Sequence, residues 1–391
     1  MSSKLRERNE KIINRVLTEG KEIKSFRENF KRVHGIDPLD QEKLPVMQEG
    51  FSFAKLQEKL SLKEADAASS FVQFLRAGVQ SITNSMYSAT PTTYEDWVTV
   101  IQSNKDTELY APNHGVSFPR QVGPNEFYPE VGVAALDLEL QNRKFGDIYA
   151  LQYELAEDDQ TGSFQRQAGL MGEYMKVLVE VWVMGKLASV ANAQYIDVKI
   201  PVSETKPSNE TTYPWSTALV GGGANRPATY TILTQPGVQA GFIGLMNQKN
   251  LQGIKMMVNP NRLIIGPSQT FDASVLLNSA YYPSGAAAAG AVGGAFSINP
   301  IKGIADLTVS RFMFKNDGTV AGDSKAWYLV DDSKPWFVVQ MREAMTVIQE
   351  VPNSGSSFEQ DVVRFKARSR FNADFIDPRF GWQGNNGSVT S

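Results

Sequence analysis

The chain has 391 residues, which is more than one hydrophobic core usually serves, so two or three cores are expected. Hydrophobic residues make up 42% of the sequence, enough for sizeable cores. The formal net charge is -3, which argues against a dedicated nucleic-acid reader, because such proteins carry a strong basic surplus. Cysteine is absent, which excludes disulfides, thiolate catalysis and cysteine metal sites. The two histidines, His34 and His114, lie far apart in sequence, and their scarcity argues against an enzyme.

Sequence motifs for targeting and for catalysis are missing. The charged N-terminus lacks the apolar segment of a secretory signal, and the small-residue stretch 284–296 is too short to span a membrane, so no membrane partner is expected. No nucleophile elbow, HExxH, Walker or dinucleotide motif occurs, so we expect no enzymatic activity and no cofactor. A set such as His114, Ser117 and Asp137 can be assembled, but nothing local supports it.

The first elements predicted along the chain are helices. Residues 1–43 have a basic surplus and a narrow apolar stripe, which is typical either of a helix that binds a partner or of a solvated helix packed on its own domain. Ser61 and Glu64 form a capping box, and helical apolar spacing continues from there to Ile82. Pro91 marks the loop that ends this helix.

An extended arm is predicted next. Residues 108–135 combine prolines and glycines with short bursts of β-forming residues, which favours a turn-rich extended segment. Such an arm is marginal in water and should lean on another surface. The following residues, 136–155, alternate well enough for strands.

Three carboxylates, Glu157, Asp158 and Asp159, precede a long helical pattern over 164–190. Asp159, Thr161 and Ser163 are N-cap residue types, and acids there meet the positive end of the helix dipole. A catalytic or metal-binding role would need a second acidic cluster or a histidine, which the stretch lacks. We therefore interpret the acids as the start of a helix.

The middle of the chain mixes helices and strands. Residues 191–230 are polar and rich in Pro and Gly, which favours a flexible surface excursion; the GGGAN segment is not a phosphate loop. Alternating helical and strand patterns then follow, which suggests an α+β or α/β domain. The predicted helices cover 236–250 and 268–282, and the predicted strands cover 254–267, 306–314 and 325–332.

The tail from 335 onward predicts three strands. In the middle one, Arg364, Lys366, Arg368 and Arg370 alternate with a less polar set formed by Val362, Phe365, Ala367, Ser369 and Phe371. The basic face could touch a phosphate backbone. A solvated face or intersubunit salt bridges explains it better in a chain that is close to neutral.

In this order, the elements resemble those of the major capsid protein of a tailed double-stranded DNA bacteriophage, in the family that shares the Hong Kong 97 (Johnson) fold. The resemblance covers most of the chain and rests on the arm 108–135 and on four sequences: LQYELAEDDQTGSFQRQAGLMGEYMKVLVEVW, NRLIIGPSQTFDASVLLNS, AWYLVDDSKPWFVVQMREAMTV and VVRFKARSRFNADFIDPRFGWQG.

The resemblance implies an α+β fold with six consecutive parts. They are an N-terminal arm (1–60), a first piece of a peripheral domain (61–107), an extended β-hairpin loop (108–137), the peripheral domain with a spine helix (138–190), an axial domain (191–340) and C-terminal strands of the peripheral domain (341–391).

The resemblance also implies a function. The chain would be a non-catalytic structural subunit that assembles with itself into pentamers and hexamers of an icosahedral head enclosing double-stranded DNA. It would reside in the virion after assembly in the host cytoplasm. Its further partners would be portal and scaffolding proteins, a decoration protein, and packaged DNA bound non-specifically on the inner face. The subunit-interface residues expected on this basis are Phe118, Arg120, Phe127, Tyr128, Arg368, Arg370 and Arg379.

Three other interpretations stay open at the level of sequence. An encapsulin-like nanocompartment shell would share the fold and enclose protein cargo, although the basic leading arm disfavours it. A hydrolase would use the carboxylates from Glu157 to Asp159. A phage tail or baseplate component would differ in the symmetry of its assemblies.

Some members of the family crosslink through a lysine in the extended loop, or lose an N-terminal segment by proteolysis. Here Lys105 and Lys144 bracket the arm and no lysine lies between them. We expect the N-terminal arm to be retained, with a separate scaffolding protein.

We predict no covalent crosslink through the arm, because it offers no lysine amine. Mature particles should give a single subunit band on a denaturing gel, and a ladder of covalent multimers would contradict this.

Overall fold

The computed structural model describes residues 78–391 except 112–118, 120, 129, 131–137, 153–162, 197–198, 201–213, 220–221, 284–295, 316, 321–323, 351–361 and 389–391. The chain divides into two compact units, Met1–Phe71 and Val72–Ser391, and every described residue lies in the second. The expected helices over 1–43, the capping box at Ser61 and the acids at 157–159 lie outside the described residues. The described part mixes helices with β-sheets, which confirms the α+β class.

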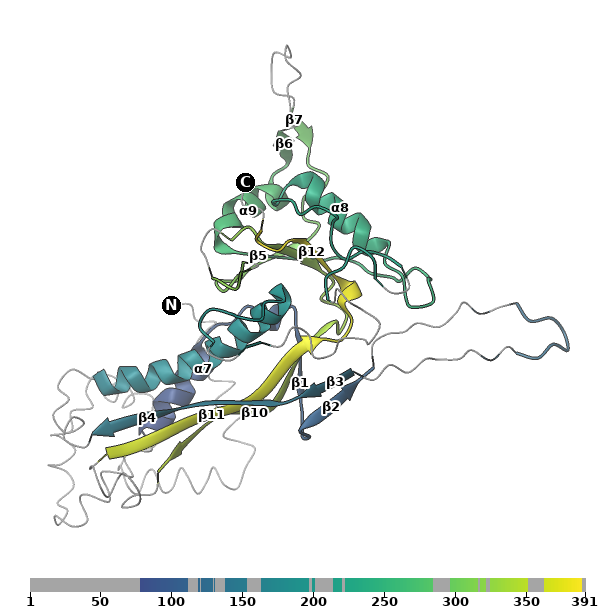
Figure 1. Cartoon of the computed structure of the whole chain (residues 1–391). Helices are drawn as coiled ribbons and strands as arrows, with labels where there is room; N and C mark the ends of the chain where they lie inside the picture. Colours follow the sequence, from purple (N-terminus) through teal and green to yellow (C-terminus); the bar gives the residue numbers. More distant parts are fainter. Residues whose placement is uncertain are drawn as a thin grey trace, which may run out of the picture. The chain divides into compact units, whose positions relative to one another are not determined.

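The long-strand sheet has the order β1-β10-β11-β4 (Figure 1). Its strands are β1 (Thr99–Gln102), β4 (Arg143–Gln152), β10 (Phe337–Gln349) and β11 (Val362–Phe375). β1 runs parallel to β10, and the other neighbours are antiparallel. Between Phe365 and Phe371, buried residues of β11 alternate with more exposed ones, which confirms the predicted two-faced strand.

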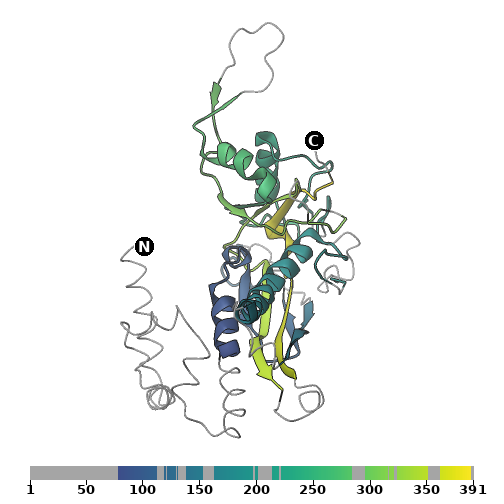
Figure 2. The ribbon, with the colours of Figure 1, turned by 90° about the vertical axis from the view of Figure 1, so that its left-hand side faces the viewer.

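Helix α7 (Ser163–Ala188) packs on one face of this sheet, and its bounds confirm the predicted long helix (Figure 2). The Trp182 ring lies 5.0 Å from the Phe145 ring of β4 and 6.5 Å from the Phe371 ring of β11. Trp182 Nε1 also donates to Asn372 Oδ1 at 3.1 Å. Helix α7 therefore covers the face of the sheet that carries Phe145 and Phe371.

A second helix, over residues 78–89, lies directly against α7. Thr83 Oγ1 donates to the Ala168 carbonyl at 3.0 Å. A Cβ on Gly172 would lie 2.2 Å from the Thr83 carbonyl oxygen, so only glycine permits this approach.

The short-strand sheet has the order β12-β9-β5-β8. Its strands are β5 (Arg262–Ile265), β8 (Asp306–Val309), β9 (Trp327–Val330) and β12 (Gly381–Asn385). Helix α8 (Gln235–Met246) packs on β12 and β9, while α9 (Thr270–Asn278) contacts β8 (Figure 1). The predicted helices and strands of this region are confirmed, but the strands are shorter than their sequence patterns suggested.

The remaining elements are small. The β2–β3 ribbon pairs Thr107–Tyr110 with Leu138–Gln141 and forms the root of the predicted arm. The β6–β7 ribbon pairs Tyr281–Pro283 with Phe296–Ile298 and projects beyond α8 and α9 (Figure 1). Short 3-10 turns are η1 (Tyr94–Asp96), η2 (Pro267–Gln269) and η3 (Pro378–Phe380).

The chain crosses between the two sheets three times: from β4 through α7 and α8 to β5, directly from β9 to β10, and from β11 through η3 to β12. The last two crossings lie close together. Aromatic rings fill this crossing, with neighbouring centroids 4.8–6.5 Å apart. We call this group the aromatic junction; its members are Trp97, Trp215, Tyr328, Trp336, Phe337 and Phe375. One continuous core therefore serves both sheets.

The prediction of a flexible surface excursion over 191–230 is wrong where described residues of this range are buried, as the contacts of Trp215 and Asn225 show. Trp215 is buried in the aromatic junction, and its Nε1 donates to the Leu187 carbonyl at 2.8 Å. Asn225 is fully buried, where its amide accepts from Ser216 N and donates to the carbonyls of Pro214 and Pro378. The polar composition of the segment gave no sign of these two buried side chains. One indole and one amide are nevertheless enough to attach a polar loop to the core.

Three buried charged groups of α7 and β11 complete the framework. Lys186 Nζ lies 3.1 Å from Asp374 Oδ2, and both side chains are 0% exposed. The Glu180 carboxylate accepts from Thr93 N, from Thr93 Oγ1 and from Ser310 Oγ at 2.5–3.1 Å. Glu180 thereby ties α7 both to the loop before η1 and to the loop after β8.

We predict that Lys186→Met lowers the free energy of unfolding by about 3–5 kcal/mol, because it leaves the buried Asp374 carboxylate without its lysine counter-ion. The double variant Lys186→Met/Asp374→Leu should recover most of this loss. Urea unfolding of the soluble full-length chain measures both effects.

Arg368→Met is the matched control. It removes a more exposed partner of Glu343 and should cost about 1 kcal/mol or less. Equal losses for Lys186→Met and Arg368→Met would contradict the buried-pair argument.

Candidate functional site

The described residues hold no recognisable catalytic centre. Nowhere among them do three or more His, Asp or Glu side chains gather in a way that could hold a metal ion. Within the same part of the chain, no helix has the length and apolarity needed to cross a membrane. The set His114, Ser117 and Asp137 and the acids 157–159 lie outside the described residues.

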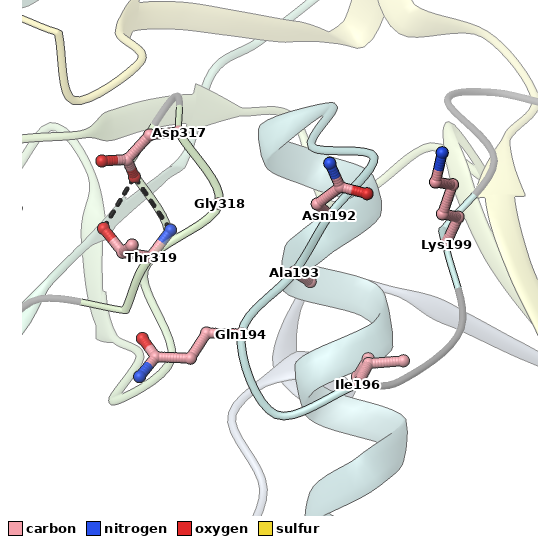
Figure 3. Close-up of a pocket in the computed structure, with 8 residues that line it drawn as sticks. All are labelled: Asn192, Ala193, Gln194, Ile196, Lys199, Asp317, Gly318 and Thr319. Carbon is pink, nitrogen blue, oxygen red and sulfur yellow. Dashed lines mark hydrogen bonds between the residues drawn. The ribbon is translucent and has the colours of Figure 1, made fainter.

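A shallow hollow lies between the loop after α7 and the turn that carries Asp317, Gly318 and Thr319 (Figure 3). Its polar side chains make structural hydrogen bonds. Asp317 Oδ1 accepts from Thr319 N at 2.9 Å and from Thr319 Oγ1 at 2.6 Å, and these bonds lower the pKa of Asp317. Gln194 Oε1 accepts from Val320 N. The polar groups of the hollow thus hold its own loops, and it pairs no nucleophile with a base.

The face of the long-strand sheet opposite α7 is basic. It carries Arg364, Lys366, Arg368 and Arg370 of β11, as the alternation predicted. Arg368 Nη2 lies 2.7 Å from Glu343 Oε1, and this hydrogen bond lowers the pKa of Glu343. The predicted basic face is therefore confirmed, and part of it is neutralised within the subunit.

Asp106 lies at the root of the β2–β3 ribbon and binds both sheet strands. Its Oδ1 lies 2.8 Å from Arg342 Nη1 of β10 and 3.0 Å from Arg370 Nη2 of β11. Its Oδ2 accepts from Gln141 Nε2 at 3.1 Å. The Gln141 hydrogen bond, together with the two guanidinium groups, holds the pKa of Asp106 below its ordinary value.

Further polar contacts fix this root. Asn142 Nδ2 donates to the Lys105 carbonyl at 2.8 Å, and Tyr110 OH donates to Gln340 Oε1 at 2.9 Å. Asn372 Nδ2 donates to the Gln141 carbonyl at 2.7 Å. The arm is thus attached to the sheet through hydrogen bonds and ion pairs, in addition to the buried Leu138 and Leu140 of β3.

The predicted interface residues fall into four groups, one of which, Arg368 and Arg370, lies on the basic face described above. Phe118 and Arg120 lie outside the described residues. Phe127 and Tyr128 lie on the arm and are 98% and 85% exposed. Arg379 is only 6% exposed, and its Nη1 lies 3.2 Å from Asp377 Oδ1, so little of it is left to contact another subunit.

Sequence reasoning missed a second set of exposed apolar side chains, around the short-strand sheet. Helix periodicity places apolar residues on a face but does not say whether the face is covered. Exposed members of this set lie on α8, on α9, on the β6–β7 ribbon and on the loop before β5: Ile243, Met246, Met257, Phe271, Val275, Tyr281 and Ile298. Exposed apolar groups at this density are typical of surfaces that bind other macromolecules.

Comparison with known proteins gives one family. The model of the phage capsid protein family matches residues 137–383. This range begins just before β3 and ends within β12, so it includes most of both four-stranded sheets. No curated protein matches the chain.

Solved structures with a similar arrangement come from capsids and particles. The virus-like particle from Pyrococcus furiosus is 11% identical, with a TM-score of 0.45 over 78% of this chain and 98% of that chain. The capsid of the native GTA particle is 11% identical, with a TM-score of 0.45 over 74% and 88%. The procapsid of bacteriophage JBD30 is 16% identical, with a TM-score of 0.40 over 83% and 76%.

We predict that Asp106→Asn lowers the melting temperature at pH 7 by a small amount, on the order of 1–3 °C. The folded-state pKa of Asp106 is depressed, so its stabilisation is present above the unfolded pKa and is lost as the pH falls through the folded value. The difference from the wild type should therefore shrink as the solution is made more acidic and disappear once the Asp106 carboxylate is protonated in the folded state, as followed by scanning fluorimetry.

Asp272→Asn is the control, because Asp272 is an exposed carboxylate that makes no ion pair with a described residue. A pH-independent effect of Asp106→Asn would contradict the prediction.

Proposed function

The chain belongs to the phage capsid protein family, and from this membership we propose that it is the major head subunit, assembling into rings of five and six copies in an icosahedral shell around double-stranded DNA. It is a structural subunit of a shell and not an enzyme. The observation that carries the proposal is the family match over residues 137–383, which takes in most of both four-stranded sheets and the crossing between them. The exposed apolar and basic surfaces of the described subunit are consistent with extensive contacts to other copies.

The six-part division of the chain belongs to the proposal. Residues 1–60 serve as an N-terminal arm and 108–137 as the extended loop. The peripheral domain is formed by 61–107, 138–190 and 341–391. The axial domain is formed by 191–340. The layering supports most of this division, because the long-strand sheet and α7 form one group and the short-strand sheet with α8 and α9 forms the other. Two strands depart from it: β12 (Gly381–Asn385) belongs to the short-strand sheet, and β10 of the long-strand sheet begins at Phe337.

A ring of identical subunits needs two different surfaces that fit each other, one on each flank, because the contact is heterologous. The exposed apolar residues on separate helices, Ile243 of α8 and Phe271 of α9 among them, can supply two such surfaces. Each contact can be modest, since many contacts per subunit add up through multivalency.

Further partners follow from a head of this kind. We propose contacts with a portal and a scaffolding protein, contact with a decoration protein, and non-specific contact with packaged DNA on the inner face. Assembly takes place in the host cytoplasm, and the finished subunit resides in the virion. Phe118, Arg120, Phe127, Tyr128, Arg368 and Arg370 remain our candidate interface residues, with Arg379 as a support for the turn at η3.

The test is electron microscopy of the full-length chain, expressed alone and with its neighbouring genes. Closed shells, or rings of five and six subunits, are expected. Persistent monomers in both preparations would contradict the capsid function. Shells that contain a protein cargo in place of DNA would identify a nanocompartment.

Phe271→Asp sharpens this test. Phe271 is 84% exposed in the subunit, so the substitution should leave folding unchanged and shift most subunits from particles into unassembled material on a density gradient. Ser85→Asp introduces the same charge at an exposed polar position of the helix over 78–89 and serves as the control. Normal assembly of the Phe271→Asp variant would show that Phe271 of α9 is not needed for the contacts between subunits of a ring.

A further inference from the structure

Strand β10 extends well beyond the neighbour that pairs with one of its edges. β10 has 13 residues, but β1 pairs only with Val338–Met341. No other described strand lies on this side of β10. Past the end of β10, Glu350 N donates to the Arg364 carbonyl of β11 at 2.9 Å. Because backbone groups alternate in direction along a strand, Val347 and Gln349 direct theirs away from β11, toward the side that β1 leaves unpaired.

The helix over 78–89 lies beside this edge of β10 (Figure 2). Gln80 Nε2 donates to the Val347 carbonyl at 2.8 Å. Burial raises the pKa of the Tyr87 hydroxyl, and a hydrogen bond from the Met345 backbone opposes that rise. Two side chains of the helix therefore take the place that a neighbouring strand would have along Met345 and Val347.

The same helix is anchored on α7 as well as on β10. The Thr83 hydroxyl is bonded to the Ala168 carbonyl, and the two helix backbones meet at Gly172. Lys176 Nζ lies 5.6 Å from the centroid of the Tyr87 ring. The helix is thus a separate element that α7 holds along the edge of β10.

The sequence of this edge favours pairing with another strand. Residues 344–349 read AMTVIQ, with three β-branched residues and no charge, proline or glycine. Segments of this kind are typical of strands that add to one another when their backbone groups are free. Proteins protect such edges with lysine, with proline or with a covering element, and residues 344–349 have only the last of these three.

We propose that the helix over 78–89 is a strap that closes the β10 edge of the unassembled subunit to strand addition by a second copy. The occupant that the strap excludes is the same edge of another copy, because two identical edges can pair antiparallel about a two-fold axis. Such a contact is isologous and closed, so it forms dimers and not rings. The inference goes beyond the role in a shell, since the strap acts before any shell forms.

The experiment displaces the strap with Gly172→Ala in the full-length chain. The added Cβ would lie 2.2 Å from the Thr83 carbonyl oxygen and should push the two helices apart, while alanine favours the helical conformation of α7 itself. In unassembled subunits, hydrogen exchange of the amides over 345–349 should become about tenfold faster. Analytical ultracentrifugation should then show dimers at concentrations at which the wild type is monomeric.

Gly169→Ala is the matched control on the same helix. Its Cβ would meet the side chains of Met86 at 3.2 Å and Ile82 at 3.7 Å, so the strap should stay in place and the subunit should stay monomeric. Gln349→Pro tests the edge itself, because it removes an N–H group that points away from β11 and so blocks strand addition. The double variant Gly172→Ala/Gln349→Pro should be monomeric.

A further variant keeps the test decisive if Gly172→Ala is insoluble. Gln80→Glu/Tyr87→Phe removes both side-chain contacts with the edge and should change exchange and association in the same direction. Three outcomes would overturn the proposal: exchange and association like those of the wild type in the strap variants, dimers that persist when Gln349→Pro is added, and equal association of Gly169→Ala.

Discussion

The aromatic junction is the constraint on which the rest of the described structure depends. The chain passes between the two sheets twice within a short distance, next to Trp336 and through Asp377–Phe380. Rings from four separate stretches of the chain, carried by Trp97, Trp215, Trp336 and Phe375, meet there and exclude water. The two sheets consequently share one core, and surfaces carried by either sheet keep a defined relation to the shared strands β10 and β11.

Away from this junction, the attachments become polar. Lys186 and Asp374 form a buried ion pair, which is weak support for stability but strongly favours one alignment of α7 on β11. The arm root depends on the half-exposed Asp106 and on buried amide side chains such as Asn142. The subunit thus combines an apolar centre with an arm whose attachment through Asp106 we expect to weaken at low pH and at high ionic strength.

Local patterns were sufficient to predict much of the fold. The 3.6-residue period predicted α7 within two residues at each end, and alternation predicted β11 and its basic face. The same reasoning missed the partners of that face, because Asp106 and Glu343 come from segments far away in sequence and the pairing depends on strand register. It also misjudged Trp215, since a polar, glycine-rich context conceals a single buried indole. Of the candidate interface residues, Arg368 and Arg370 could be placed on a face from sequence, but their neutralisation could not.

The close contact between Gly172 and Thr83 has a mechanical consequence. Because the backbone of α7 touches the backbone of the helix over 78–89, with the Thr83 hydroxyl bonded to Ala168, the two helices cannot slide past each other without breaking that bond or colliding. Any load that enters the chain ahead of residue 78 is therefore transmitted into α7, and through Trp182 and Lys186 into β11. A pulling force on the chain would thus be distributed by α7, the longest described helix, over the strands that it contacts.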